Sequence, residues 1–402
     1  MKMLNDLLTL DALPSDWQEA TLVGRAWLPD APAGPSPVAV RPNGDVIDLV
    51  AIEPTMSQLL ARTDRVALAR TAPGKVIGTV EALLANSGDG RNAGKPWLLA
   101  PIDLQAIKAS GVTFVQSLLE RVIEEQARGD TAKADAIRVQ VMRIMGANLA
   151  SVKPGSREAE EIKRVLVAQG AWSQYLEVGI GPDAEIFTKS QVMSAVGMGA
   201  EVGLHPKSSW NNPEPEIVLA VTATGETVGA TLGNDVNLRD FEGRSALLLG
   251  KSKDNNASCA VGPFIRLFDD KFGMAEVRQA DLGLEIAGTD GFVLDGVSSM
   301  SKISRDPLDI VTHAWGPYHQ YPDGFVLFLG TMFSPVKDRG APGMGFTHKI
   351  GDLVSISTPK LGRLVNRVTT SDKAPPWTFG ISALMRNLAA RGLLRKEYNL
   401  QN

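Results

Sequence analysis

The chain has 402 residues and an ordinary globular composition, with 44% hydrophobic and 21% charged residues. Its 41 basic and 45 acidic residues show no long run of one sign, which argues against nucleic-acid or membrane-surface binding. Cys259 is the only cysteine, so an intramolecular disulfide and a cysteine-based zinc site are both excluded. The length favours two domains.

No segment has the uninterrupted apolar character of a secretory signal or a membrane helix. Asn5, Asp6 and Asp11 interrupt the apolar residues of the N-terminal segment. No window approaches the roughly 20 apolar residues that span a bilayer. We therefore expect a cytoplasmic protein with no membrane partner.

Residues 1–100 predict a small N-terminal α/β domain. Between residues 20 and 50, short apolar runs alternate with turns that contain Pro, Gly or Asn, which is typical of β-strands. Thr55 is placed to cap a short helix that continues to about Leu60. A second helix is expected near residues 78–86.

The longest helical pattern begins near Thr113 and places its apolar residues on one face. It breaks at Gly129 and is expected to resume through Met145. A further charged helix is expected over residues 155–170. Together these segments predict a helical insertion near residues 125–170, most simply a solvated helical hairpin.

From about residue 185 the sequence becomes rich in strand-like runs separated by Gly-containing turns. Residues 304–315 are the one interruption that predicts a helix. We expect an α+β protein in which a large, mostly antiparallel, β-rich C-terminal domain spans residues 101–402.

Two glutamates stand two residues apart at the entry to an expected strand. Glu214 and Glu216 lie in the segment PEPEIVLAV, and residues two apart on a strand point to the same face. Carboxylates that are forced together repel each other and need a cation or a proton between them. A solvated strand end is the alternative, which Pro213 and Pro215 would also fit.

A hairpin after this strand brings a third carboxylate to the pair. A two-residue turn at Thr224-Gly225 makes the numbers of paired residues sum to 449 and places Glu214 opposite Asp235. A turn shifted by one residue makes the sum 451 and pairs Glu216 with Asp235 instead. Directly opposed Cβ atoms lie about 5 Å apart, so either register predicts a cluster of three carboxylates.

Three carboxylates with no cysteine or histidine nearby suit a hard cation, first Mg²⁺, with Mn²⁺ or Ca²⁺ as alternatives. Such a site leaves coordination positions open for water and for a chelating substrate. Arg239 and Lys251 follow the cluster and offer a cation for a substrate carboxylate and a basic amine. From composition alone, Lys253 is an equally good candidate for the basic amine.

These segments together resemble the fumarylacetoacetate hydrolase superfamily over roughly residues 100–370. Its members carry a Glu-x-Glu strand, an Asn-Asp-x-x-x-Arg-Asp segment, a Lys three residues before an Asp, and a late Gly-Thr. The resemblance implies a metal held by Glu214, Glu216 and Asp235, a catalytic Lys251, a substrate-facing Arg239, and a closing segment at Gly330 and Thr331. Glu242 stands where many members have Gln, which puts that contact in doubt.

The stretch from Gly111 to Glu120 matches the segment in which hydrolases of the family carry a water-activating histidine. Ser117 occupies the histidine position, and a serine without a histidine partner is a poor base. This variant, with Trp210 shortly before PEPE, resembles the branch that dehydrates 2-keto-3-deoxy sugar acids. The resemblance implies a dehydratase that converts 2-keto-3-deoxypentonate to 2-oxoglutarate semialdehyde in pentose oxidation. Lys251 is expected to be the C3 base, and Ser117 or Glu120 to assist the leaving hydroxyl.

The resemblance also implies a small-molecule 2-oxo acid as the partner, no nucleic acid, and a homodimer or a higher homo-oligomer. The main rival is a C–C hydrolase of acylpyruvates or 2,4-diketo acids, for which His313 and His319 are candidate bases. A non-catalytic, metal-stabilised binding protein is disfavoured, because a purely structural site needs no open coordination position.

Overall fold

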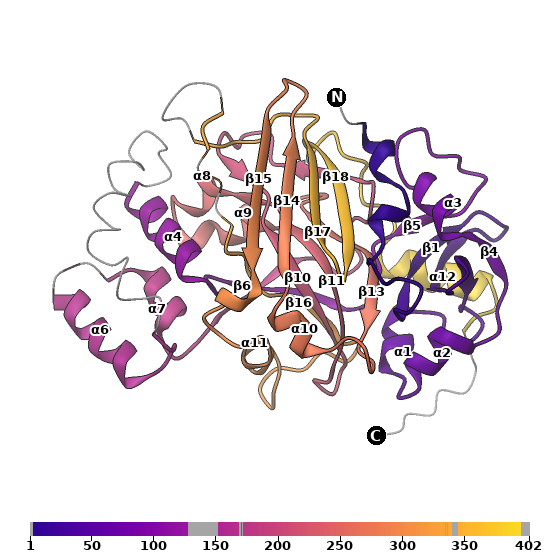
Figure 1. Cartoon of the computed structure of the whole chain (residues 1–402), viewed down its shortest axis with the longest axis horizontal. Helices are drawn as coiled ribbons and strands as arrows, with labels where there is room; N and C mark the ends of the chain where they lie inside the picture. Colours follow the sequence, from indigo (N-terminus) through magenta and orange to yellow (C-terminus); the bar gives the residue numbers. More distant parts are fainter. Residues whose placement is uncertain are drawn as a thin grey trace.

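The computed structural model describes residues 3–127, 152–168, 170, 172–333, 335, 337–339 and 345–394. Two β-sheets form the middle of the molecule, with a group of helices at one end and the N-terminal elements at the other (Figure 1). Among the described helices, none combines the length and the apolar character that a membrane span requires. The molecule is therefore a mixed α and β protein with large sheets, as expected.

Within the described part of the chain, the larger sheet has eleven strands and a single parallel pair, β16 with β6. Its strand order is β4-β3-β2-β1-β13-β11-β10-β16-β6-β7, with β5 paired to β1. The strands are β1 (Leu22–Leu28), β2 (Gly34–Val40), β3 (Asp45–Asp48), β4 (Val76–Thr79), β5 (Trp97–Leu99), β6 (Ala106–Gly111), β7 (Glu185–Ser190), β10 (Pro215–Val221), β11 (Thr227–Asp235), β13 (Cys259–Leu267) and β16 (Phe325–Phe328).

The described residues also form two smaller sheets. The five-stranded sheet has the order β15-β14-β17-β18-β8, and a two-stranded sheet joins β12 to β9. These strands are β8 (Glu201–Leu204), β9 (Asn211–Asn212), β12 (Asn237–Leu238), β14 (Asp281–Ala287), β15 (Val293–Ser299), β17 (Leu353–Thr358) and β18 (Gly362–Thr370).

The described helices lie mainly where the sequence pattern predicts them. The Oγ1 atom of Thr55 caps the first helix by accepting the Gln58 N–H at 3.2 Å. The expected continuation from Gly129 to Met145 lies outside the described residues. The helices are α1 (Met56–Ala61), α2 (Arg65–Thr71), α3 (Val80–Ala85), α4 (Val115–Ala127), α6 (Arg157–Ala168), α7 (Gln174–Ile180), α8 (Arg239–Glu242), α9 (Leu249–Lys253), α10 (Met274–Arg278), α11 (Pro307–Ala314) and α12 (Ile381–Ala390).

The elements before residue 100 are joined to the rest of the chain through the larger sheet and through the C-terminal helix. Strand β1 pairs with β13, so the sheet runs across the expected boundary. Helix α12 lies beside the N-terminal strands (Figure 1), where Asn387 Nδ2 donates to Ala33 O at 2.6 Å. The division into domains at residue 100 stays a prediction.

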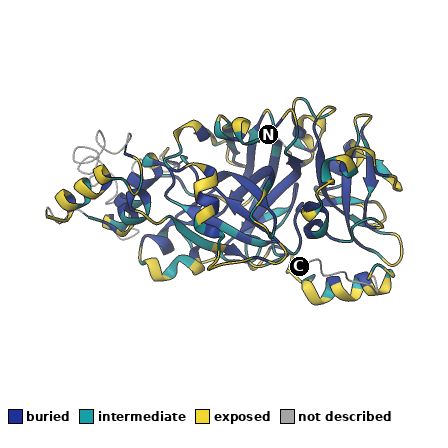
Figure 2. Cartoon of the chain, turned by 90° about the horizontal axis from the view of Figure 1, so that it is seen from below, coloured by how far each residue is buried: buried dark blue, intermediate teal, exposed yellow. Residues whose placement is uncertain are grey.

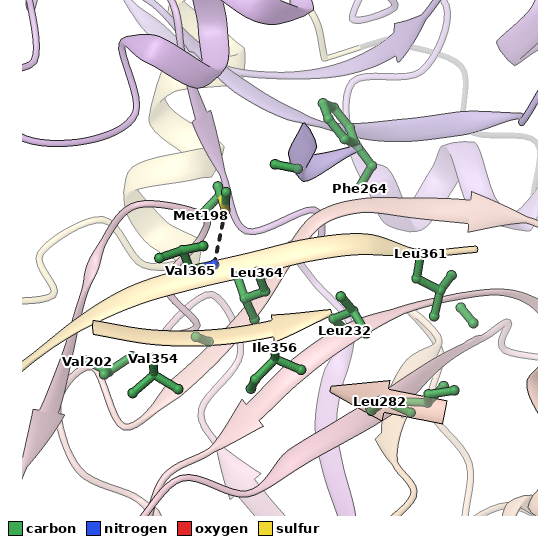
Figure 3. Close-up of a cluster of buried hydrophobic side chains, with 14 of the residues drawn as sticks. Met198, Val202, Leu232, Phe264, Leu282, Val354, Ile356, Leu361, Leu364 and Val365 are labelled. Atoms are coloured by element: carbon green, nitrogen blue, oxygen red, sulfur yellow. Dashed lines mark hydrogen bonds between the residues drawn. The ribbon is translucent and has the colours of Figure 1, made fainter. Parts of the chain in front are cut away.

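The main core lies between the two large sheets. Leu232 of β11 packs in one cluster with Leu282 of β14 and Ile356 of β17, and all three are buried (Figure 3). The sulfur of Met198 accepts the backbone N–H of Val365 at 3.2 Å in the same cluster. Exposed residues gather instead on the outward faces of the helices, while the central strands are buried (Figure 2). The core therefore fixes the position of β10 and β11, which carry the predicted carboxylates.

The β10–β11 hairpin has the first of the two expected registers. Pro215 pairs with Asn234, and Glu216 pairs with Gly233, so the residue numbers sum to 449. The backbone N–H of Asp235 donates to Glu214 O at 3.0 Å, which places these two residues opposite each other. A bulge at Ala220/Val221 absorbs the irregular turn that follows.

A buried arginine ties the N-terminal segment to the centre of the larger sheet. Arg266 of β13 is fully buried and donates from both Nη atoms to Asp16, at 2.7 and 3.0 Å. Lys360 Nζ also donates to Asp16, at 2.7 Å. Burial alone would raise the pKa of Asp16, but these two cations lower it to about 2.

Asp16→Asn is expected to lower the free energy of unfolding by about 2 kcal/mol at neutral pH, because it leaves the buried guanidinium without a charged partner. The pKa of Asp16 is lower in the folded protein than in the unfolded chain, so its contribution is present above pH about 4 and is lost as the pH falls toward 2. Urea unfolding at several pH values measures both effects. The exposed Asp11→Asn variant is the control, and an equal loss of stability in both variants would contradict this account.

Candidate active site

The three predicted carboxylates meet in the folded chain. Oxygens of Glu214, Glu216 and Asp235 lie within 4.8 Å of one another, and all three side chains are buried, with 3%, 2% and 1% exposed. Burial raises the pKa of Glu216 well above its usual value, and the charges of Asp235 and Glu214 raise it further. The hairpin register thus produces the carboxylate cluster that the sequence predicts.

Two buried lysines compensate part of this negative charge. Lys253 Nζ lies 2.6 Å from Glu214 Oε2 and 2.9 Å from Asp235 Oδ2. Lys189 Nζ lies 3.0 Å from the other oxygen of Asp235. Burial alone would raise the pKa of Asp235, but Lys189 and Lys253 hold it below its usual value.

A small cavity adjoins the cluster, and helix α4 contributes to its wall. Arg121 of α4 contacts Glu214, and its Nη1 lies 3.3 Å from Glu242 Oε2. The cavity is lined by Ser110, Gly111, Val112, Ser117, Arg121, Tyr175, Glu185, Phe187, Glu214, Glu216, Asp235, Glu242, Lys253, Gly330 and Thr331. Helices α4 and α7 therefore cover the polar face of the larger sheet.

The charges around this cavity favour a divalent cation. Five carboxylates surround the cavity, those of Glu185, Glu214, Glu216, Asp235 and Glu242. Three basic side chains oppose them, those of Arg121, Lys253 and, behind the cluster, Lys189. The fully ionised site therefore carries a charge of −2. Buried charge without compensation is costly, and one divalent ion removes the imbalance. The all-oxygen donor set of Glu214, Glu216 and Asp235 is the type that Mg²⁺ prefers.

The structure places Lys253, not Lys251, against the carboxylates. Lys251 is exposed, and its Nζ lies 5.7 Å from the centre of the Phe241 ring, outside the cavity lining. Both lysines are on the five-residue helix α9, where residues two apart point in nearly opposite directions. Only one of them can face the site, and in this structure it is Lys253.

The predicted substrate-facing arginine also lies beside the cavity and not in its lining. The Arg239 guanidinium lies 4.4 Å from the centre of the Trp210 ring, and its Nη1 donates to Pro335 O at 3.3 Å. Its Nη2 lies 3.9 Å from Glu120 Oε2. The structure therefore brings Arg239 and Glu120 together as a pair, next to the carboxylate cluster.

The remaining predicted residues line the cavity. The backbone N–H of Gly330 donates to Glu216 Oε2 at 2.6 Å, and Thr331 follows it in the wall. Gly330 has φ +84°, and a Cβ there would lie 2.1 Å from Thr113 Oγ1, so glycine is required. Ser117 lines the cavity, with its hydroxyl donated to Phe114 O at 3.0 Å.

Strand β7 supplies functional groups that the sequence interpretation missed. Glu185, Phe187 and Lys189 alternate along this strand, and the first two line the cavity while Lys189 contacts Asp235. Alternate residues of a strand share a face. The alternation in EIFTKS was the available signal, but nothing in the sequence showed that β7 lies near the hairpin.

Glu185 differs from the other acids of the site. Its carboxyl group forms no hydrogen bond or ion pair with any described residue. It packs against Gly111 so closely that a Cβ atom added to this glycine would lie 1.9 Å from Glu185 Oε2. Burial raises the pKa of Glu185 to about 7, and the Glu242 carboxylate adds to the shift. An unpaired carboxyl group with a pKa near neutrality is suited to accept and return a proton.

The candidate histidines do not join this site. His313 lies 3.8 Å from Asp309, and His319 stacks on Tyr321 with ring centres 4.8 Å apart. Neither residue is part of the cavity lining in the described part of the chain. The hydrolase alternative therefore lacks the histidine base that it was expected to use.

Two curated dehydratases are similar to this chain in sequence, although no family model matches it. Over 196 residues, 49% of this chain, it is 28% identical to a probable 2-keto-3-deoxyxylonate dehydratase of Haloferax volcanii. Over 184 residues, 46% of this chain, it is 29% identical to a 2-dehydro-3-deoxy-D-arabinonate dehydratase of Saccharolobus solfataricus. The matched regions span 64% and 58% of those proteins, less than two thirds of each.

Solved structures show the same fold over 87% of this chain. A 2-keto-3-deoxy-D-arabinonate dehydratase matches with a TM-score of 0.61 in its apo form, and with 0.60 in its complex with magnesium and 2,5-dioxopentanoate. Each of these two structures is 20% identical in sequence to this chain, and the match covers 99% of its length. A fumarylacetoacetate hydrolase from Exiguobacterium antarcticum matches with a TM-score of 0.51 at 16% identity, over its full length. These likenesses confirm the fold that the resemblance predicts.

Divalent cations are expected to stabilise the protein through the carboxylate cluster. Mg²⁺ at 100 times its dissociation constant should raise the free energy of unfolding by about 2.7 kcal/mol, and EDTA should reverse this. Glu216→Gln should fold, because burial already favours the neutral form of Glu216, but it should lose the Mg²⁺ effect. Thermal unfolding with and without Mg²⁺ measures the difference. Glu226→Gln, in the exposed turn of the same hairpin, is the control. Equal stabilisation of the Glu216 variant by Mg²⁺ would show that the metal binds elsewhere.

Proposed function

We propose that this chain is a metal-dependent dehydratase of the fumarylacetoacetate hydrolase superfamily that removes water from 2-keto-3-deoxy sugar acids. One observation carries the proposal: the unpaired carboxyl group of Glu185 shares a cavity with the carboxylate cluster. The similarity to curated dehydratases supports the substrate class.

Glu214, Glu216 and Asp235 would hold the cation, Mg²⁺ first. When bound, such a cation supplies Lewis acidity that polarises a 2-oxo group and makes the neighbouring C3 protons more acidic. Gly330 fixes the orientation of Glu216 through its backbone N–H. Lys189 and Lys253 fix Asp235 in the same way, so the three ligands are oriented before the substrate arrives.

Glu185 takes the role of general base, in place of a lysine. Burial alone would lower the pKa of Lys253, but Asp235, Glu214 and Glu242 outweigh it and hold the pKa above its usual value. A lysine that remains protonated cannot accept a proton at neutral pH. Glu185 removes a C3 proton, the C3–H electrons form the C3=C4 bond, and the C4–O bond breaks.

The proton on Glu185 can then be returned to the departing hydroxyl, which leaves as water. One carboxyl group serves both steps, and a pKa near 7 suits both directions of transfer. Ser117 lines the same cavity and is positioned to assist the leaving hydroxyl, whereas Glu120 is engaged with Arg239. With 2-keto-3-deoxypentonate, tautomerisation of the dehydrated acid gives 2-oxoglutarate semialdehyde. The expected cytoplasmic location and homo-oligomeric state rest on composition and resemblance.

Purified protein with Mg²⁺ is expected to convert 2-keto-3-deoxypentonate to a product that is one water lighter, and EDTA should abolish the conversion. Mass spectrometry identifies the product. An acylpyruvate, incubated in parallel, should release no pyruvate, because hydrolysis requires an activated water and the lining shows no histidine among the described residues. Pyruvate release without dehydration of the pentonate would establish the C–C hydrolase instead.

A further inference from the structure

Helix α12 is fixed to the rest of the molecule along one side. Arg391 donates from Nη1 to Pro35 O at 2.7 Å and from Nη2 to Ser36 Oγ at 2.8 Å. Leu384 and Leu388 are buried, with 3% and 5% exposed, and pack in one small apolar cluster. The position of the helix is therefore set by these contacts, and its remaining side chains project from a fixed axis.

The outer side of this helix carries apolar side chains that stay exposed. Ile381 and Met385 lie one helical turn apart and are 47% and 59% exposed. Leu394, just beyond the helix, is 53% exposed. Exposed residues run along the outer side of α12, the helix beside the C label in Figure 2. Apolar residues that are exposed together, and not singly, mark an interaction surface.

A groove of about 570 Å³ adjoins this apolar ridge. Helix α12 forms one wall of the groove with Ile381, Met385 and Leu388. Residues 53–58, which lead into α1, line it together with Asp323 and form the far wall. The wall on α12 is apolar and the far wall is largely polar. A partner that fits this groove presents apolar side chains next to a positive charge.

The far wall and the helix carry opposite charges. Asp323 is exposed and forms no ion pair within the described part of the chain. Arg386 is also exposed, and no described carboxylate pairs with it. It follows Met385 by about 100° around the helix, on the flank turned away from Leu384 and Leu388. The two charges therefore lie on opposite sides of the apolar ridge and its groove.

We propose that a second copy of this chain binds at this surface, with helix α12 of each copy lying in the groove of the other. An isologous contact requires one patch that is complementary to itself. This patch has a ridge and a groove, and it has unpaired charges of both signs. A different protein would require only one half of each pair, so the presence of both halves favours a second copy.

The charges meet in this arrangement. When the ridge of each copy enters the groove of the other, the flank of α12 turned away from its own groove meets the far wall of the other groove. Arg386 of one copy then faces Asp323 of the other, and the symmetry makes this contact twice. The groove shares no lining residue with the carboxylate cavity, so the inference does not depend on the proposed function.

The mass of the full chain in solution tests the inference, measured by light scattering after gel filtration. Met385→Glu should halve the mass of the assembly, because it places a charge in the apolar contact of each copy. Met385 is largely exposed within one chain, so the variant should fold. Val165→Glu is the matched control, because Val165 lies on helix α6 with 55% exposed, and it should leave the mass unchanged. A monomeric wild type, or a Met385 variant with the mass of the wild type, would overturn the inference.

A charge exchange tests the same contact with two residues that are exposed within one chain. Arg386→Asp and Asp323→Arg should each weaken the association by about tenfold, because like charges then meet twice. The double variant should recover most of this loss, because the reversed pair is again complementary. Sedimentation equilibrium measures the dissociation constants. Losses that add in the double variant would show that the two residues do not meet and would contradict the arrangement.

Discussion

Three ionised carboxylates cannot occupy one buried site unless positive charge is buried with them. In this protein the requirement is met from three directions. Lys253 arrives from α9, Lys189 from β7 and Arg121 from α4, and each contacts Glu214 or Asp235. The elements of the site are thus tied together by charge as well as by packing.

The same requirement separates the roles of the acids. Glu214, Glu216 and Asp235 are fixed by lysines, by a backbone N–H or by the hairpin, so they are suited to hold a cation. Glu185 is left without a partner among the described residues, and its pKa is near 7. A site with fixed acids for a metal and one free acid for a proton can perform metal-assisted elimination next to a carbonyl group.

The carboxylate cluster could be predicted because it depends on local pairing. Glu214, Glu216 and Asp235 belong to one hairpin, so strand alternation and turn geometry nearly determine their proximity. The mixed α and β content and several helices followed from periodicity in the same way. The choice between the two registers needed the bulge at Ala220/Val221, which the turn residues did not specify.

The rest of the site depends on contacts between segments far apart in the chain. Glu185 and Lys189 reach the hairpin only because β7 pairs with β6 and β6 with β16. The orientation of α9, which turns Lys253 inward and Lys251 outward, depends on tertiary packing and not on composition. The resemblance supplied the residue types but not this geometry.

The central claim is that Glu185 removes a C3 proton from a 2-oxo acid held at the carboxylate cluster. The direct measurement is deuterium exchange at C3 of 2-oxopentanoate in D₂O, followed by proton NMR with Mg²⁺ present. The account predicts Mg²⁺-dependent exchange whose rate rises with pH as Glu185 loses its proton. Glu185→Gln should slow the exchange by about 10²–10⁴-fold, while Lys251→Ala should leave it unchanged. Undiminished exchange in the Glu185 variant would contradict the account and assign the base to another residue.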